Sequence, residues 1–331
     1  MSKIFVSRKL PGNSLDRLLS SGHEVKVSEF DRPLTAEEFL DGARGCDAVL
    51  SFLTDKIDGE VIDAIGPQLK IISNYAVGFN NINVDQASEK GVLVANTPSD
   101  EVNEAVAEHA WVLMLALARR IVEADESTKR GSYRGWEPAI FLGKNMMGKT
   151  LGIVGMGRIG SMVAKRAKGW DMRILYNKRS PDPELESELG VEFADIDRLY
   201  AESDFITLHV PLTEETTHMI NSSSIAKMKK GVCIVNTARG PIIKEQDLVD
   251  ALRNGQLGGA ALDVFENEPN INPELIAMEN VVLTPHIASA TWEARNKMGE
   301  QAVDSILKVL SGEKPDEVCF VNPNVWPLRK I

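Results

Sequence analysis

Residues 150–170, TLGIVGMGRIGSMVAKRAKGW, give the clearest indication of the fold. An apolar run typical of a strand leads into Gly155, Gly157 and Gly160, and helical periodicity follows at once. In such a unit the first glycine permits a tight turn, the second lets a pyrophosphate approach the backbone, and the third lets helix and strand pack closely. The glycine spacing alone is weak evidence, but strand, loop and helix in this order predict a dinucleotide-binding unit.

Short apolar runs alternate with helical patterns on both sides of this stretch. Strands are predicted at 3–7, 23–29, 47–53, 69–76, 92–98, 172–178, 191–194, 204–211, 232–238, 258–265 and 280–288. Helices are predicted at 13–22, 35–43, 59–66, 83–91, 195–203, 222–229, 245–255 and 292–312. Strands that alternate with helices imply parallel pairing, so we expect an α/β protein with two doubly wound parallel-sheet units.

Three segments fall outside this alternation. Residues 103–131 have the pattern of one long helix with a wide apolar face. Residues 132–149 are rich in glycine and aromatic side chains and predict an irregular arm, and the tail 314–328 predicts extended chain.

Composition narrows the class of protein. The chain has 331 residues, of which 43% are hydrophobic, so two domains with buried cores are expected. A net charge of -11 argues against nucleic acid and anionic membranes as partners, and an anionic substrate would need a local cationic pocket. Cys46, Cys233 and Cys319 are odd in number and widely spaced, which favours a reducing cytoplasm. The N-terminus lacks a signal-peptide core, and no metal site is expected.

The end of the second strand in this unit bears on the cofactor. An NAD site usually has an acidic residue about twenty positions beyond the glycines, where it binds the ribose diol. Asn177 and Lys178 stand there instead, followed by Arg179 and Ser180. Two cations and a hydroxyl suit a 2′-phosphate, although a solvated basic turn is the alternative. The sequence therefore favours NADP(H) and leaves NAD(H) open.

Nearly end to end, the chain resembles the D-isomer-specific 2-hydroxyacid dehydrogenase family, in particular its glyoxylate/hydroxypyruvate reductase branch. The motifs that carry the resemblance are NYAVGFNNINV, EAVAEHA, GKTLGIVGMGRIG, DFITLHVPLTEETTHMIN, VNTARGPII, ALDVFENEP and VLTPHIASAT. The resemblance implies a Rossmann-type cofactor domain, residues 100–287, inserted into a flavodoxin-like substrate-binding domain, residues 1–99 plus 288–331. It also implies a homodimer formed through the long helix near 102–121 and the arm after it.

The resemblance implies three catalytic residues, Arg239, Glu268 and His286. Arg239 follows an apolar strand, where α/β sheets bind ligands, and its guanidinium can hold the oxygens of a 2-oxo acid. His286 also follows an apolar strand and can donate a proton to the ketone oxygen as hydride reaches carbon. Glu268 would orient the imidazole and stabilise its protonated form. Glu266 is the rival carboxylate, and the family spacing favours the one before Pro269.

Other positions are implied to line the site. The backbone N–H groups of Val77 and Gly78 would hold the substrate carboxylate, with Leu53 facing the substrate. Asp263 would bind the nicotinamide amide, with Val106 near the nicotinamide phosphate. The further implied cofactor contacts are Gly155, Gly157, Arg158, Ile159, Gly160, Asn177, Lys178, Arg179, Ser180, His209, Val210, Pro211, Thr237, Ala238, Arg239, His286 and Ala288. His109, on the long helix, is interpreted as a core residue.

The sequence thus predicts NADPH-dependent reduction of glyoxylate or hydroxypyruvate, with the substrate carboxylate on Arg239 and the proton from His286. A phosphite or phosphoglycerate dehydrogenase on the same scaffold is an alternative, although the latter would often carry a regulatory extension. A formate dehydrogenase fits less well, because that branch replaces the glutamate with glutamine. A non-catalytic NAD(H)-sensing corepressor is the alternative from another class, and a long disordered interaction tail would favour it.

Overall fold

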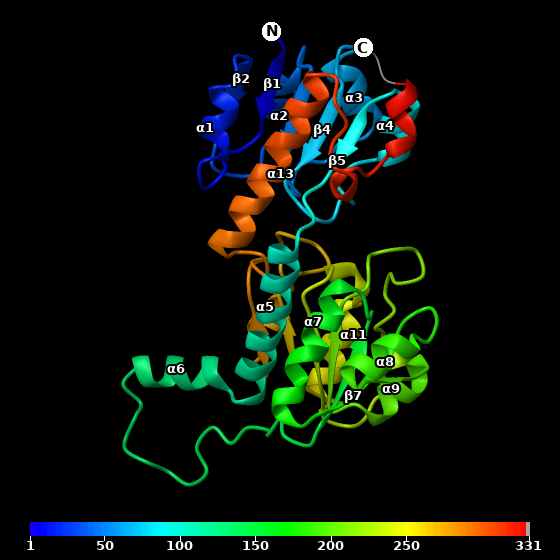
Figure 1. Cartoon of the computed structure of the whole chain (residues 1–331). Coiled ribbons are helices and arrows are strands. Elements are labelled where there is room, and N and C mark those ends of the chain that lie inside the picture. Colours follow the sequence, from blue (N-terminus) through cyan, green and yellow to red (C-terminus); the bar gives the residue numbers. More distant parts are fainter. Residues whose placement is uncertain (329–331) are drawn as a thin grey trace. The chain divides into compact units, whose positions relative to one another are not determined.

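The computed structural model describes residues 1–328. The chain forms two compact units, Met1–Val102 with the segment from Ala290 onward, and Asn103–Ser289. The second unit is therefore an insertion into the sequence of the first, and each has its own sheet and core (Figure 1). The expected fold class, two parallel-sheet α/β units with one inserted into the other, is confirmed.

The first unit contains a five-stranded parallel sheet in the order β2-β1-β3-β4-β5, which is flavodoxin-like. Its strands are β1 (Lys3–Val6), β2 (Glu24–Val27), β3 (Ala48–Ser51), β4 (Ile71–Asn74) and β5 (Leu93–Ala95). Its helices are α1 (Ser14–Leu19), α2 (Ala36–Ala43), α3 (Gly59–Ile65), α4 (Val84–Glu89) and α13 (Trp292–Leu310). β3, β4 and β5 are buried along their whole length because helices cover both faces of the sheet.

The C-terminal tail corrects one expectation, because it is not simply extended. It forms the 3-10 turns η3 (Glu317–Cys319) and η4 (Pro323–Leu328). The side chain of Asn322 accepts a hydrogen bond from Val94 N–H and donates one to Val92 O, which ties the tail to β5. The tail also pairs with β5 through an isolated antiparallel bridge between Ala95 and Phe320, in which Asn96 N–H donates to Cys319 O at 2.9 Å and Val321 N–H donates to Val94 O at 3.0 Å.

The second unit contains a seven-stranded parallel sheet in the order β12-β11-β10-β9-β6-β7-β8. Its strands are β6 (Thr150–Val154), β7 (Arg173–Asn177), β8 (Glu192–Phe193), β9 (Phe205–Leu208), β10 (Val232–Asn236), β11 (Leu257–Leu262) and β12 (Val281–Leu283). This is the order of dinucleotide-binding folds, and its direction reverses between β6 and β9, where such folds bind their ligand.

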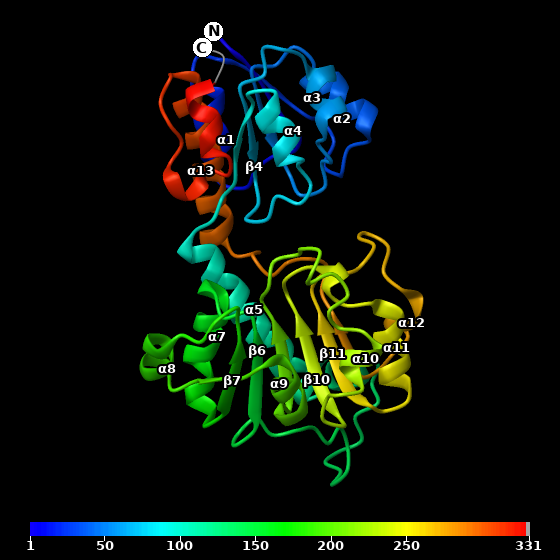
Figure 2. The ribbon, with the colours of Figure 1, turned by 90° about the vertical axis from the view of Figure 1, so that its right-hand side faces the viewer.

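Helices cover both faces of this sheet (Figure 2). The helices of this unit are α5 (Asp100–Ala118), α6 (Ile121–Lys129), α7 (Arg158–Ala167), α8 (Pro183–Leu189), α9 (Ile196–Glu202), α10 (Ser222–Ile225), α11 (Glu245–Arg253) and α12 (Pro273–Ile276), with the 3-10 turns η1 (Lys168–Trp170) and η2 (Gly240–Ile242). α5 and α7 pack on one face, and α9, α10 and α11 pack on the other. The sequence did not predict α8 and α12, whose N-caps are Asp182 and Asn272, each followed by a proline at the first helical position.

The expected single helix at 103–131 is wrong, because α5 ends at Ala118 and α6 begins at Ile121. Arg120 between them has a φ of 53°, in the left-handed region. α5 buries Ala110, Trp111 and Met114 in the core, whereas α6 buries no residue of its own. The packing that supports α5 therefore stops at its end, and α6 turns away from the sheet (Figure 1).

The register of the second sheet brings the ends of its strands to one edge. Val154 pairs with Asn177 and Leu208, Asn236 with Leu208 and Leu262, and Leu262 with Leu283. The residues that follow these strand ends include most of the predicted cofactor contacts and all three predicted catalytic residues. None of the helices in residues 1–328 combines the length and apolar character that a membrane span needs.

Candidate active site

The glycine loop between β6 and α7 leaves room that side chains would fill. Gly155 has a φ of 99°, and a Cβ there would lie 2.6 Å from the backbone of His209. A Cβ on Gly160 would lie 2.3 Å from the carbonyl oxygen of Gly155. Gly157, the N-cap of α7, faces open space, with no described atom within 4 Å of such a Cβ. The cradle and the helix N-terminus behind it fit a dinucleotide pyrophosphate.

The end of β7 presents fewer free cations than the sequence suggests. The Asn177 side chain donates to Ala194 O at 2.9 Å. Lys178 Nζ donates to Asp182 Oδ2 at 2.9 Å, and this contact is the main cause that lowers the pKa of Asp182. Arg179 and Ser180 are exposed. One of the two cations that the sequence assigns to a 2′-phosphate is therefore already paired with a carboxylate.

Arg239 lies at the carboxyl end of β10, just before η2. Asn236 fixes this turn, because its amide donates to Arg239 O at 2.9 Å and its side-chain oxygen accepts from Ala238 N–H at 3.0 Å. A Cβ on Gly240 would lie 1.8 Å from Phe265 O, so the turn packs directly against the segment that leads to Glu268. Burial lowers the pKa of Arg239, and the charge of Glu268 opposes that shift. A guanidinium stays protonated at neutral pH, so the site keeps its local cation.

His286 and Glu268 form a direct pair. His286 Nδ1 lies 2.8 Å from Glu268 Oε2, and Glu268 Oε1 accepts from Phe265 N–H at 3.0 Å. Burial alone would raise the pKa of Glu268. The hydrogen bond and charge of His286, the Phe265 amide and the charge of Arg239 outweigh burial and lower that pKa. With Nδ1 engaged, Nε2 is the ring nitrogen left to exchange a proton with a substrate.

The rival carboxylate, Glu266, has a different set of partners. Its Oε1 pairs with His218 Nε2, and its Oε2 accepts from Glu245 N–H at 3.0 Å. The Glu266 N–H in turn donates to Glu245 Oε1 at 2.6 Å. Glu268, not Glu266, is therefore the partner of His286 in this structure.

Asp263, at the end of β11, holds the loop that carries His286. Its Oδ1 accepts from the Thr284 hydroxyl at 2.7 Å and from Ile287 N–H at 2.8 Å, and its Oδ2 accepts from Ala288 N–H at 2.8 Å. The side chain is fully buried. A contact between Asp263 and the nicotinamide amide remains a prediction, and the structure gives the carboxylate a second task.

His209, another predicted cofactor contact, is an unsuitable proton donor. Its Nε2 lies 2.9 Å from the Thr207 hydroxyl. Burial lowers the pKa of His209 to about 4, so the imidazole is neutral at neutral pH. Of these two histidines, His286, which is paired with a carboxylate through Nδ1, is the one that suits proton donation.

Thr237 has an unsatisfied hydroxyl. The residue is 7% exposed, and its Oγ1 has no hydrogen-bond partner among the described residues. A buried hydroxyl without a partner is costly, so this one, next to Ala238 and Arg239, fits a bound ligand. The other predicted contacts of this unit lie in the first turn of α7, on α5 or after β9 and β12, namely Arg158, Ile159, Val106, Val210, Pro211 and Ala288.

The predicted substrate-binding residues of the first unit follow the ends of β3 and β4. Leu53 is 37% exposed. The side-chain amides of Asn96 and Asn74 donate to Val77 O at 2.6 Å and to Gly78 O at 3.0 Å, which fixes the loop that carries both residues. These residues belong to the first unit, whereas Arg239, Glu268 and His286 belong to the second.

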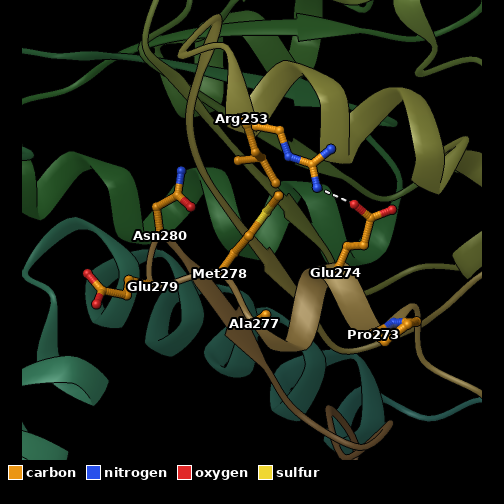
Figure 3. A pocket seen from close by; sticks show the side chains of 8 residues that line it. Arg253, Pro273, Glu274, Ala277, Met278, Glu279 and Asn280 are labelled. Carbon is orange, nitrogen blue, oxygen red and sulfur yellow. Dashed lines mark hydrogen bonds and ion pairs between the residues drawn. The ribbon is translucent and has the colours of Figure 1, made fainter.

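A surface hollow between α11 and α12 is separate from this site (Figure 3). Arg253 and Glu274 form an ion pair beside it, and Met278 contributes to its lining. It contains none of the predicted site residues. Residues 1–328 also contain no cluster of three or more His, Cys, Asp or Glu side chains that could hold a metal ion.

Sequence reasoning did not assign a site role to His109 or Thr284. His109 Nε2, on α5, lies 3.1 Å from Thr284 Oγ1. A histidine within a long apolar helix is itself a signal, because a buried imidazole needs a polar partner. The identity of that partner could not be read from the sequence.

Comparison with known proteins gives one consistent result. Residues 111–288 match the family described as D-isomer specific 2-hydroxyacid dehydrogenase, NAD binding domain. The chain is 46% identical to a glyoxylate reductase of Thermococcus onnurineus (strain NA1), over 99% of this chain and 98% of that protein. Its structure is similar to that of the TT0316 protein from Thermus thermophilus, with 40% identity, a TM-score of 0.89 and coverage of 96% and 99%. A glyoxylate reductase from Paecilomyes thermophila is 32% identical, with a TM-score of 0.82 and coverage of 97% of each chain.

Proposed function

Since the chain belongs to the D-isomer-specific 2-hydroxyacid dehydrogenase family and is an oxidoreductase that uses a nicotinamide cofactor, we propose that it reduces glyoxylate or hydroxypyruvate to the 2-hydroxy acid. The observation that carries the proposal is the His286–Glu268 pair beside Arg239, at the edge of the sheet that holds the glycine cradle. The relatives do not favour a phosphite or phosphoglycerate dehydrogenase or a corepressor.

In this proposal the nicotinamide, when bound, supplies the hydride. Arg239 binds the substrate carboxylate and draws electron density toward the carbonyl oxygen. The imidazolium of His286 delivers its Nε2 proton to that oxygen and becomes neutral, and in the oxidation direction the neutral ring takes the proton back. Glu268 on Nδ1 fixes the ring plane and compensates the charge of the imidazolium.

The first unit contributes the remaining contacts of the proposal. The N–H groups of Val77 and Gly78 hold the substrate carboxylate, in a loop that Asn96 and Asn74 fix through the carbonyls. Leu53 faces the substrate and favours small side groups.

The cofactor that we propose is NADPH. Arg179 is an exposed cation next to the Ser180 hydroxyl, and no acidic residue stands at the position that binds a ribose diol. The pairing of Lys178 with Asp182 makes Arg179 the main candidate for the 2′-phosphate.

Initial rates with three acids test the proposal. Glyoxylate, hydroxypyruvate and pyruvate are each offered with NADPH and with NADH, and oxidation of the cofactor is followed. We expect turnover with glyoxylate or hydroxypyruvate and a higher kcat/KM with NADPH. Turnover of phosphite with NAD+, without turnover of any 2-oxo acid, would replace the proposal by the phosphite alternative. Cofactor binding without any turnover would favour a sensor.

We also propose that the protein is a cytoplasmic homodimer. The arm between α6 and β6 supports the dimer. Tyr133, Trp136, Leu142 and Met147 are between 68% and 84% exposed, and a second copy of the chain would cover them. Three free, buried cysteines suit a reducing compartment. Sedimentation equilibrium should give twice the mass of the chain, and cell fractionation checks the compartment.

A further inference from the structure

The proposed mechanism makes no use of one hydrogen-bond network beside the catalytic histidine. It starts on α5, where His109 Nε2 lies 3.1 Å from Thr284 Oγ1 and 3.4 Å from Asp263 Oδ1. The Thr284 hydroxyl donates to Asp263 Oδ1 at 2.7 Å. Because the Thr284 proton is used in that bond, its oxygen accepts the hydrogen bond from His109. The imidazole of His109 is therefore protonated on Nε2.

The network ends on the backbone that carries His286. His286 has a φ of 55°, a left-handed conformation that residues other than glycine rarely adopt. Its N–H donates to Asp263 O at 2.8 Å, and the next two N–H groups, of Ile287 and Ala288, donate to the Asp263 carboxylate. One aspartate thus holds three consecutive backbone amides, and these hydrogen bonds keep His286 in its strained left-handed conformation.

Asp263 in turn depends on its polar partners. It is fully buried, and burial alone would raise its pKa. Hydrogen bonds from His109, Thr284 and the two amides outweigh burial and lower the pKa, which keeps Asp263 a carboxylate. Ala110 and Trp111, the neighbours of His109 on α5, are buried in the core, so His109 is a rigid anchor for the network.

We propose that His109 is a positioning residue for proton transfer, which acts through Thr284 and Asp263 to hold loop 284–288 so that His286 presents its imidazole to the substrate. The proposal rests on the assignment of His286 as proton donor. His109 itself touches neither substrate nor cofactor in this scheme.

Two substitutions at one position test the role of the Nε2 donor. His109→Phe keeps the ring and removes the donor, and His109→Gln places an N–H near the position of Nε2. We expect kcat of the Phe variant to fall by at least about tenfold, because a displaced proton donor slows the chemical step. KM for glyoxylate and Kd for NADPH should stay near the wild-type values. The solvent deuterium isotope effect on kcat should rise, and the Gln variant should recover most of the loss.

Glu108→Gln is the matched control. Glu108 precedes His109 on α5, and its side chain is 58% exposed. The substitution should leave kcat, KM, the Kd for NADPH and the isotope effect unchanged. If the Phe variant does not fold, His109→Asn replaces it, because the shorter Asn amide does not reach the position of Nε2. The kcat of His109→Gln must then exceed that of His109→Asn. A wild-type kcat and isotope effect in the Phe or Asn variant would overturn the proposal, and so would a loss confined to KM.

His286→Ala, measured in parallel, separates this proposal from the proposed function. If His286→Ala is inactive and His109→Phe has the wild-type kcat, only the proposed role of His109 is wrong. If His286→Ala is active, the assignment of His286 as the proton donor is wrong, and the proposed function fails with it.

Discussion

At the scale of single residues, the partners of a side chain decide what it can do. Lys178 and Arg179 are equivalent in the sequence, yet Lys178 is bound by Asp182 while Arg179 is exposed. In the same way Glu266 and Glu268 look alike in ENEP, but Glu266 pairs with His218 and Glu268 pairs with His286. Function at this edge of the sheet follows from which group is left available.

The cofactor phosphate gives the first prediction. Arg179→Asp should shift the ratio of kcat/KM from NADPH toward NADH by roughly tenfold or more, because a charge-assisted contact to the 2′-phosphate becomes a repulsion. Lys178→Ala should have a much smaller effect, since its charge is already compensated. Steady-state rates with both cofactors check this, and an equal loss with NADPH and NADH in Arg179→Asp would count against a 2′-phosphate site.

His209 gives a prediction about pH and stability. Its pKa of about 4 lies below the value of about 6.5 for an unfolded histidine. As the pH falls from about 6.5 to about 4 the unfolded state therefore binds the proton first, and the folded state loses stability, by up to about 3 kcal/mol. His209→Gln removes this titration, so its thermal midpoint should fall less than that of the wild type over the same range. The measurement is Tm as a function of pH for the wild type and for His209→Gln. If the two proteins lose Tm equally as the pH falls, the fold does not hold His209 neutral.

At the scale of elements, the strand–turn–helix unit was predictable because all of its determinants lie within residues 150–170. The break between α5 and α6 was not predictable, because it depends on where the packing against the core ends. The helical periodicity of the sequence continues across the break. The loop that carries His286 was predictable only in part. Thr284 and His109 are 175 residues apart in the chain, and no local pattern could have joined them.

The glycine loop allows a matched pair of substitutions. Gly155→Ala should lower Tm, because the new Cβ would lie 2.6 Å from the His209 backbone at a φ of 99°. Gly157→Ala should leave Tm almost unchanged, since no described atom is within 4 Å of its Cβ, yet it should weaken NADPH binding by about tenfold or more because the methyl group occupies the approach of the pyrophosphate. Calorimetry and fluorescence titration separate the two effects, and unchanged affinity in Gly157→Ala would mean that the pyrophosphate lies elsewhere.

For the molecule as a whole, the proposed anion site lies on an acidic chain. Against the net charge of -11, the proposed site places the guanidinium of Arg239 and the side chain of His286 after parallel strands far apart in the sequence. The family, the α/β class and the insertion of one unit into the other could be inferred from motifs along the chain. The three proposed catalytic residues, and the pairing of Glu268 with His286, were predicted from the same motifs. The contacts of Asn236, Phe265 and Asp263 that fix them required the structure.

A single-turnover measurement with His286→Ala shows whether His286 donates the proton to the substrate. The variant is loaded with NADPH, mixed with saturating glyoxylate, and the decay of nicotinamide absorbance is compared with the wild type. We predict that NADPH binds with unchanged affinity and that the rate of its oxidation falls by about 10²- to 10⁴-fold, the range that general acid catalysis contributes. Oxidation of NADPH at the wild-type rate would exclude His286 as the proton donor, because the proton would then come from another group.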